Sequence, residues 1–118
     1  MTLITEAQYT ELLDNGYAAL AADRVGLDID LWPVVKLFTR DGYARWLLTE
    51  IDPANADRAF GLCDFGDGRP VLGSVSLHDI EDMRYKPGLR VERDLHFVAD
   101  KPLSAYAQVA YTRGLIIT

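Results

Sequence analysis

The chain contains 118 residues, of which 49% are hydrophobic and 25% are charged, and its formal net charge at pH 7 is −6. This composition is typical of a globular protein with one core, so we expect a single domain over residues 1–118. No stretch of about 18 apolar residues occurs, which excludes a membrane-spanning helix.

The first element expected is a helix that begins after Thr5. Thr5 followed three residues later by Gln8 is a capping-box pattern, in which each side chain hydrogen-bonds a backbone amide at the start of the helix. Apolar residues then keep helical spacing until Asn15-Gly16 interrupts them, and glycine is costly inside a helix. Either the helix ends there with a left-handed cap or it continues and tolerates the glycine. We favour an end at Asn15, followed by a second, short helix that ends near Asp23.

A β-hairpin is expected over residues 33–53. It follows an acidic linker, residues 28–33, which we expect Trp32 to anchor to the core. Two runs rich in β-branched and aromatic residues flank Asp41-Gly42, a pair typical of a two-residue type I′ turn.

The register of this hairpin defines two faces of the sheet. With a two-residue turn, Leu37 lies opposite Trp46 and Val35 lies opposite Leu48, and this inner face continues into Glu50. The outer face carries Lys36, Phe38, Arg45 and Leu47. If the helices cover the inner face alone, the outer face is an exposed mixed patch and a candidate interface. The binding residues expected on the hairpin are Lys36, Phe38, Arg45 and Trp46.

The rest of the chain predicts three further strands and two helices. The strands are expected over residues 59–65, 71–77 and 90–98, and the helices over 76–83, capped by Ser76 and Asp79, and over 103–111, ended by Gly114. Short strands joined by short loops pair as an antiparallel meander. The fold expected is therefore α+β, an antiparallel sheet of about five strands with the N-terminal and C-terminal helices packed on one face.

No catalytic or cofactor-binding motif stands out. His78 and His96 have no cysteine partner at zinc spacing, and Cys63 lies in an apolar run, where cysteine behaves as a small hydrophobic residue. The glycines form no phosphate-binding loop followed by a helix. We expect no cofactor and no metal site, and the lack of a motif argues against an enzyme without deciding the question.

Glu50 is the acid that the hydrophobic pattern does not explain, because it follows Trp46 and Leu48 on the inner face. A buried acid needs a partner or takes a raised pKa. One interpretation is structural, a pair such as Glu50–Arg93. The other is functional: four carboxylates converge to hold a hard cation or to act in acid–base chemistry, namely those of Glu50, Asp52, Glu92 and Asp94.

Charge is distributed unevenly along the chain. Residues 1–51 carry eight acids and four bases, residues 52–82 carry seven and two, and residues 83–118 carry three and six. The basic residues near Tyr85, ahead of Lys101, are Arg84, Lys86, Arg90 and Arg93. Basic residues interleaved with an aromatic ring can bind single-stranded nucleic acid, although a solvated surface of mixed charge is the simpler interpretation.

Several segments together resemble the domain-of-unknown-function family 2958. They are Val34–Phe38, Trp46–Glu50, Phe60–Asp64, Leu72–Leu77, Gly88–Phe97 and Lys101–Tyr106, and the resemblance runs in order from about Leu3 onward. Members of that family look like small bacterial proteins of plasmids and integrative or conjugative elements, often near antirestriction and transfer genes. The resemblance implies this setting but no activity and no site residue. The chain departs from it at His78, where a second serine is expected.

Three function classes remain open. The first is a cytoplasmic accessory of a mobile element that binds another protein, which the acidic first two thirds of the chain favour. The second is a nucleic-acid-binding module that uses the basic segment 84–101, and the third is a small carboxylate-dependent enzyme. The cytoplasm is expected because the N-terminal residues lack the features of a signal peptide and the single cysteine cannot form an internal disulfide.

Overall fold

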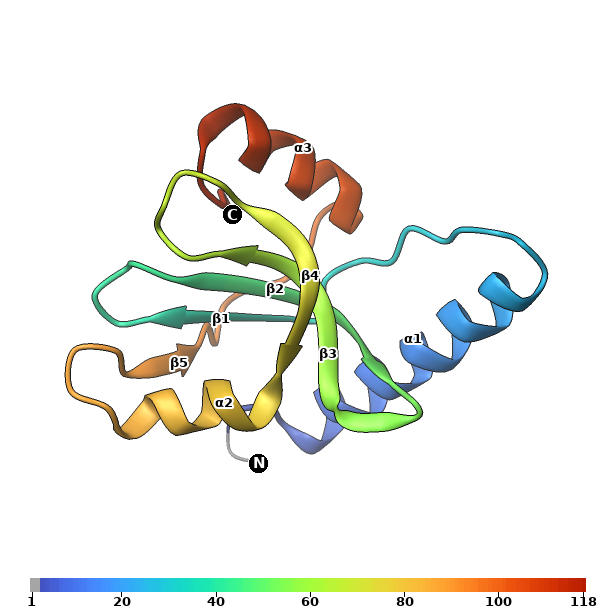
Figure 1. Ribbon diagram of the computed structural model, residues 1–118, viewed down its shortest axis with the longest axis horizontal. Coiled ribbons are helices and arrows are strands. Elements are labelled where there is room, and N and C mark those ends of the chain that lie inside the picture. Colours follow the sequence, from blue (N-terminus) through green and yellow to red (C-terminus); the bar gives the residue numbers. More distant parts are fainter. Residues whose placement is uncertain (1–2) are drawn as a thin grey trace.

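The computed structural model describes residues 3–118, and Figure 1 shows its elements. In chain order they are α1 (Glu6–Arg24), β1 (Val35–Thr39), β2 (Arg45–Asp52), β3 (Asn55–Asp64), β4 (Val71–Ser76), α2 (Leu77–Asp82), the 3-10 turn η1 (Met83–Tyr85), β5 (Val91–Arg93) and α3 (Leu103–Arg113). The strands form one antiparallel sheet in the order β4-β3-β2-β1-β5. The expected α+β fold with a five-stranded antiparallel sheet is confirmed.

The helices cover both faces of the sheet, whereas the sequence predicted that the two terminal helices share one face. One core joins Leu12 of α1 and Ile80 of α2 to the inner-face residues Val35, Leu37, Trp46 and Leu48. A second core joins Leu103 and Tyr106 of α3 to Leu47 and Leu62 on the outer face. The reason is that Leu47 and Leu62 make the outer face apolar as well, so it also needs a cover. Figure 1 shows α2 and α3 at opposite ends of the view, with the sheet between them.

Helix α1 is continuous through Asn15-Gly16, so the predicted break at Asn15 is wrong. Gly16 is buried, and a Cβ added to it would overlap the carbonyl oxygen of Ile51 on β2. Beside it, Asn15 Nδ2 donates to the carbonyl oxygen of Thr49 (2.9 Å). The pair therefore serves as the contact between α1 and β2, and this contact compensates for the low helix propensity of glycine.

The predicted register of the hairpin is confirmed, with Val35 paired to Leu48 and Leu37 to Trp46. The turn differs from the type I′ turn, which needs positive φ at both central residues. Gly42 has φ +82°, but Asp41 does not have a positive φ; its carboxylate accepts the Tyr43 N–H (3.1 Å). The chain forms a longer loop over residues 40–43, because the backbone N–H of residue 40 is turned toward the carbonyls of residues 89 and 90.

The linker before β1 is held by its backbone and by Asp30, while the predicted anchor, Trp32, is 52% exposed. The carbonyl oxygen of Leu31 accepts the Leu103 N–H (2.8 Å), and the carboxylate of Asp30 accepts both the N–H and the hydroxyl of Ser104. Asp30 thus caps α3 from outside the helix, and these contacts tie the linker to the start of α3.

The other boundaries follow the sequence closely except at β3 and β5. Strand β3 begins at Asn55, four residues before the predicted start, and the prediction missed these four residues because they are exposed and show no apolar alternation. The caps at Thr5 and Ser76 and the left-handed Gly114 (φ +78°) after α3 are as predicted. Strand β5 stops at Arg93, because the carboxylate of the next residue, Asp94, accepts the His96 N–H (2.9 Å) and turns the chain. No helix within residues 3–118 is long and apolar enough to span a membrane.

Candidate functional site

A β-bulge in β2 places Glu50 on the face opposite to the one predicted. Leu48 pairs with Gly61, but Glu50 pairs with Phe60, so Thr49 is the extra residue. An extra residue reverses the alternation of side chains beyond it. Glu50 therefore points to the outer face with Phe60, and Ile51 takes the buried inner position.

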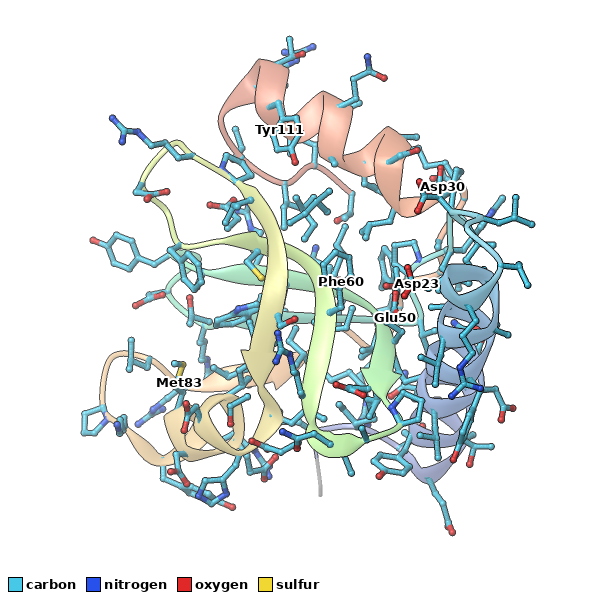
Figure 2. All side chains as sticks on the ribbon, turned by 45° about the vertical axis from the view of Figure 1, so that its right-hand side comes forward. Asp23, Asp30, Glu50, Phe60, Met83 and Tyr111 are labelled. Carbon is cyan, nitrogen blue, oxygen red and sulfur yellow. The ribbon has the colours of Figure 1, made fainter. Side chains whose placement is uncertain are left out.

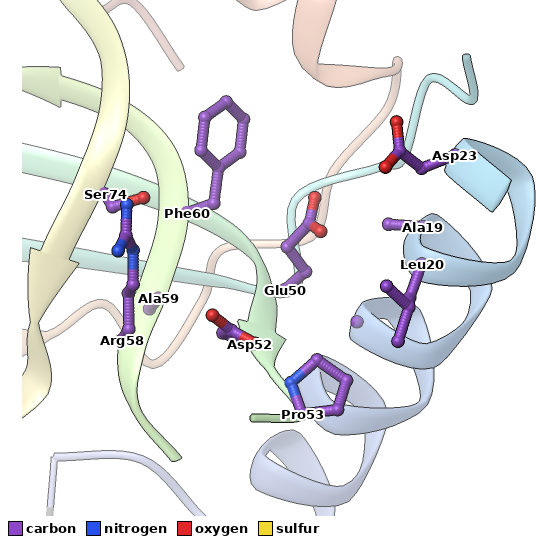
Figure 3. Close-up of a pocket in the computed structure, with 11 residues that line it drawn as sticks. Ala19, Leu20, Asp23, Glu50, Asp52, Pro53, Arg58, Ala59, Phe60 and Ser74 are labelled. Atoms are coloured by element: carbon purple, nitrogen blue, oxygen red, sulfur yellow. The ribbon is translucent and has the colours of Figure 1, made fainter. Parts of the chain in front are cut away.

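The bulge opens an acidic cleft, which we define by the carboxylates of Asp23, Glu50 and Asp52. It is an open cavity of about 500 Å³ between the C-terminal half of α1, the end of β2 and the middle of β3. Figure 2 shows Asp23, Glu50 and Phe60 grouped between the sheet and α1, and Figure 3 shows the cleft itself. Its apolar walls are Leu20, Pro53 and Phe60, and Arg58 and Ser74 lie on the far wall.

The electrostatics of the cleft favour a cation. Burial raises the pKa of the Glu50 carboxyl. The hydrogen bond from the Thr49 hydroxyl (3.4 Å) lowers this pKa by a smaller amount, and the charge of Asp52 adds the smallest effect, a further rise. Neither Asp23 nor Glu50 nor Asp52 forms an ion pair within the part of the chain that the structure describes. A positive group placed between these carboxylates would relieve their repulsion.

The four carboxylates considered as one site do not converge. Glu50 and Asp52 lie on β2, the central strand, whereas Glu92 lies on the edge strand β5 and Asp94 directly follows it. Asp94 also forms an ion pair with Lys36 (3.5 Å). Among residues 3–118, no group of three or more His, Cys, Asp or Glu side chains is placed to hold a metal ion.

The structural alternative, a Glu50–Arg93 pair, is also not formed. Arg93 pairs with Leu37 and so faces the inner side of the sheet, away from Glu50. Its guanidinium donates to the carbonyl oxygen of Leu3 (2.7 Å), which ties β5 to the segment before α1.

The hairpin residues expected to bind a partner serve the fold instead. Trp46 is buried in the inner core and stacks edge-on against Phe65. On the outer face, Lys36 Nζ donates to Thr118 Oγ1 (2.7 Å), and Arg45 Nη1 donates to the carbonyl oxygen of Ile116 (3.0 Å). Phe38 is half-buried on the same face. The segment after α3 thus lies over the patch that would have been exposed.

The basic segment 84–101 is divided by local contacts. Arg84 pairs with Glu81 (2.9 Å) and lies over the Tyr85 ring, and Lys101 pairs with Asp100 and lies over the Tyr106 ring. Lys86 and Arg90 are exposed in the turn before β5. The guanidinium of Arg93 donates to the carbonyl oxygen of Leu3, as described above. Arg84 and Lys101 are thus each held beside an acid of their own.

The histidines and the cysteine have the structural surroundings that the sequence indicated. His78 and His96 are exposed, and His78 Nε2 lies 3.6 Å from a carboxylate oxygen of Asp82. Cys63 is buried in the inner core, and this burial raises the pKa of its thiol to about 11. A thiol with that pKa is a poor nucleophile at neutral pH.

Sequence reasoning missed Asp23 and Phe60. The position of Asp23 could have been predicted from the sequence. If α1 is continuous, Gly16, Ala19 and Asp23 have the i, i+3, i+7 spacing that puts them on one face of the helix. Phe60 lies on a half-buried strand and alternates with Ala59, so its outward direction was also readable.

Comparison with known proteins gives one family match. No curated protein and no solved structure matches the chain. The model of the family described as "Protein of unknown function (DUF2958)" matches residues 3–117, which is nearly the whole sequence. This match confirms the family that the motifs resembled: the chain belongs to the DUF2958 family.

Proposed function

We propose that this protein is a small cytoplasmic accessory of a bacterial mobile element that acts by binding another protein, and that the acidic cleft holds a basic segment of that partner. The observation that carries the binding role is the cleft itself, where Asp23, Glu50 and Asp52 stand without an ion pair within residues 3–118. The mobile-element setting rests on the resemblance of the sequence motifs to the family.

A lysine or arginine side chain fits the chemistry of this cleft. Its aliphatic stem would pack against the apolar walls, while its charged end reaches the carboxylates. Phe60, which lines the cleft and also packs against the outer core, adds an aromatic side chain that a cation in the cleft could contact. Complementary charge of this kind steers association and selects the partner more than it adds raw affinity.

Binding can be tested directly with short peptides. We would titrate the protein by calorimetry with an acetylated, amidated peptide that has a central lysine, and with the same peptide carrying norleucine, which keeps the stem and removes the charge. We expect heat of binding for the lysine peptide alone. The double variant Glu50→Gln/Asp52→Asn should abolish it, and Glu11→Gln/Asp14→Asn, which removes two exposed acids of α1 outside the cleft, should not. Equal binding of both peptides would overturn the role of the cleft.

The natural partner can be sought by affinity capture from cells that carry the parent element, with and without nuclease treatment. A protein that survives nuclease, and that the Glu50→Gln/Asp52→Asn variant fails to capture, supports the proposal. Capture that is lost on nuclease treatment would instead support the nucleic-acid alternative, in which the segment 84–101 binds. Capture of the same protein by both forms would place binding elsewhere on the surface.

A second candidate is a carboxylate-dependent enzyme, which one observation favours. Glu50 has a raised pKa and stands beside Asp52 in an open cavity, an arrangement that general acid–base catalysis uses. An activity found in a hydrolase screen should fall in Glu50→Gln by a factor of at least about 100 if Glu50 transfers the proton. An activity unchanged in that variant would exclude the role.

A further inference from the structure

The two edges of the sheet differ in how they are protected. Strand β5 is three residues long, carries Glu92 and Arg93, and turns away at Asp94. Short length and charge are the usual means by which an edge strand avoids pairing with another chain. Strand β4, Val71–Ser76, is six residues long and contains neither a charged residue nor a proline.

Strand β4 is also open to solvent. Val71 is 49% exposed and Leu72 is 39% exposed, and β3 is the one strand that pairs with β4 among residues 3–118. In an antiparallel sheet, alternate residues of an edge strand turn their N–H and C=O groups outward. The outer side of β4 therefore presents backbone groups that another strand can pair with.

We propose that β4 pairs antiparallel with β4 of a second copy of this chain, about a two-fold axis, so that the two sheets become one. In such a pair, facing residues lie on the same side of the sheet, so the axis passes midway between the two copies of one residue. An axis between the two copies of Gly73 sets Val71 of each copy opposite Val75 of the other. Gly73 has no side chain, so the centre of this pair would bring backbone against backbone.

Charge complementarity is the argument for a second copy as the occupant. Antiparallel pairing brings the beginning of β4 in one copy beside the end of β4 in the other. Arg69 lies just before β4, and the exposed Asp79 lies just after it, at the start of α2. Each copy would therefore place Arg69 near Asp79 of the other, twice by symmetry, and the strands between them are neutral. The exposed carboxylate of Asp67, which accepts the Arg69 N–H (3.0 Å), lies at the same end and offsets part of this attraction.

The expected association is weak. One strand pair buries less surface than a standard stable interface, and the net charge of −6 on each copy opposes contact. We therefore expect a dissociation constant in the micromolar range or above, on the order of 10–100 µM. The proposal is independent of the acidic cleft, since it requires none of the three carboxylates.

The test is sedimentation velocity of the whole chain from about 1 to about 300 µM, a range chosen to bracket that constant. The average mass should rise toward twice that of the monomer. Arg69→Asp and Asp79→Arg should each weaken dimerisation about tenfold, and the two changes combined in one chain should restore it. Arg113→Asp, which alters an exposed cation of α3, is the matched control and should leave the mass unchanged.

Amide hydrogen exchange locates the contact. Exchange of the β4 amides that point outward should slow as the concentration rises, and the β5 amides should not change. A monomer across the whole range would overturn the proposal. So would a dimer in which exchange of the β4 amides does not slow, or one that Arg69→Asp does not weaken. A chain that stays monomeric but protects β4 on adding a different protein would show that the edge takes another partner.

Discussion

Gly16 of α1 lies directly against the backbone of Ile51, the residue that follows Glu50 in β2. A Cβ on Gly16 would overlap the Ile51 carbonyl oxygen and fall 3.0 Å from the carbonyl carbon and 3.2 Å from Cδ of Pro53. The neighbouring amide of Asn15 bonds the carbonyl oxygen of Thr49, the bulge residue. The glycine thus sets how closely α1 approaches the bulge, and with it the width of the acidic cleft.

We predict that Gly16→Ala destabilises the protein, although alanine is the better helix former by about 1 kcal/mol. The added methyl group meets backbone atoms, which cannot move aside as the end of a flexible side chain can. Overpacking of this kind should outweigh the gain in propensity, for a net loss of about 2 kcal/mol in the free energy of unfolding. Urea unfolding followed by circular dichroism measures it.

The matched control for that experiment is Gly73→Ala, the same chemical change at a position where a Cβ meets no atom within 4 Å. We expect its unfolding free energy to stay within about 0.5 kcal/mol of the parent at the same low protein concentration. Equal effects of the two substitutions would contradict the role given to the contact between Gly16 and Ile51.

The sequence predicted the hairpin register but not the bulge. Two alternating runs around a turn suffice to pair Leu37 with Trp46, because the inward residues are apolar on both strands. Past Leu48, strict alternation puts Glu50 inside and Ile51 outside. The polarity of the two residues indicates the opposite arrangement, because Glu50 is charged and Ile51 is apolar. Leu48 and Ile51 are both buried although they are three residues apart, and this break in the alternation is the sequence sign of a bulge.

The position of α3 on the outer face could also have been predicted from the pattern of apolar residues. Leu47 and Leu62 make the outer face apolar, and α3 has an apolar stripe of its own. Two other contacts could not be predicted from any local pattern. Asp30 accepts the N–H of Ser104 in α3, 74 residues away, and Asp64 accepts the N–H of Ile116 after α3, 52 residues away. Only the folded chain brings these groups together.

The raised pKa of Glu50 predicts how stability depends on pH. A carboxyl whose pKa is higher in the folded state than in the unfolded state binds its proton more tightly when folded. It therefore favours folding when protonated at low pH, and this contribution is lost as the pH rises through the folded pKa. Because Glu50→Gln removes the cost of the buried charge, we expect it to raise the melting temperature at pH 7 and to lose that advantage near pH 4.

The control for this pH profile is Glu11→Gln, which changes an exposed acid of α1 by the same chemistry. Its difference from the parent in melting temperature should be small and nearly constant between pH 4 and pH 8. A Glu50→Gln protein that melts below the parent at pH 7 would show instead that the charge of Glu50 has a stabilising partner.

Asp64 should be the most sensitive acid outside the cleft. It is 2% exposed, and its carboxylate accepts the N–H groups of Gly66 (2.9 Å) and Ile116 (3.0 Å). Asp64→Asn replaces one acceptor oxygen with a donor that faces an N–H, so we expect a loss of about 2–3 kcal/mol in unfolding free energy. Hydrogen exchange at the Ile116 amide should accelerate in parallel.

Asp67→Asn is the comparison for Asp64, because Asp67 makes the same local bond, to the Arg69 N–H (3.0 Å), but in an exposed turn. Water can replace that bond, so the cost should be below about 1 kcal/mol. If both variants lose the same free energy, the long-range bond to Ile116 contributes nothing measurable to stability.

Cys63 should be unreactive in the folded protein. With its pKa raised to about 11, about one thiol in a thousand is ionised at pH 8, and the side chain is buried in the inner core as well. We expect a thiol reagent such as 5,5′-dithiobis(2-nitrobenzoic acid) to react at least about 100-fold more slowly with Cys63 than with a cysteine introduced by Ala21→Cys on the exposed side of α1. Unfolding in urea should make the two rates equal. Fast labelling of Cys63 in the native protein would mean that the core around β3 opens readily, since the thiol has no other route to the reagent.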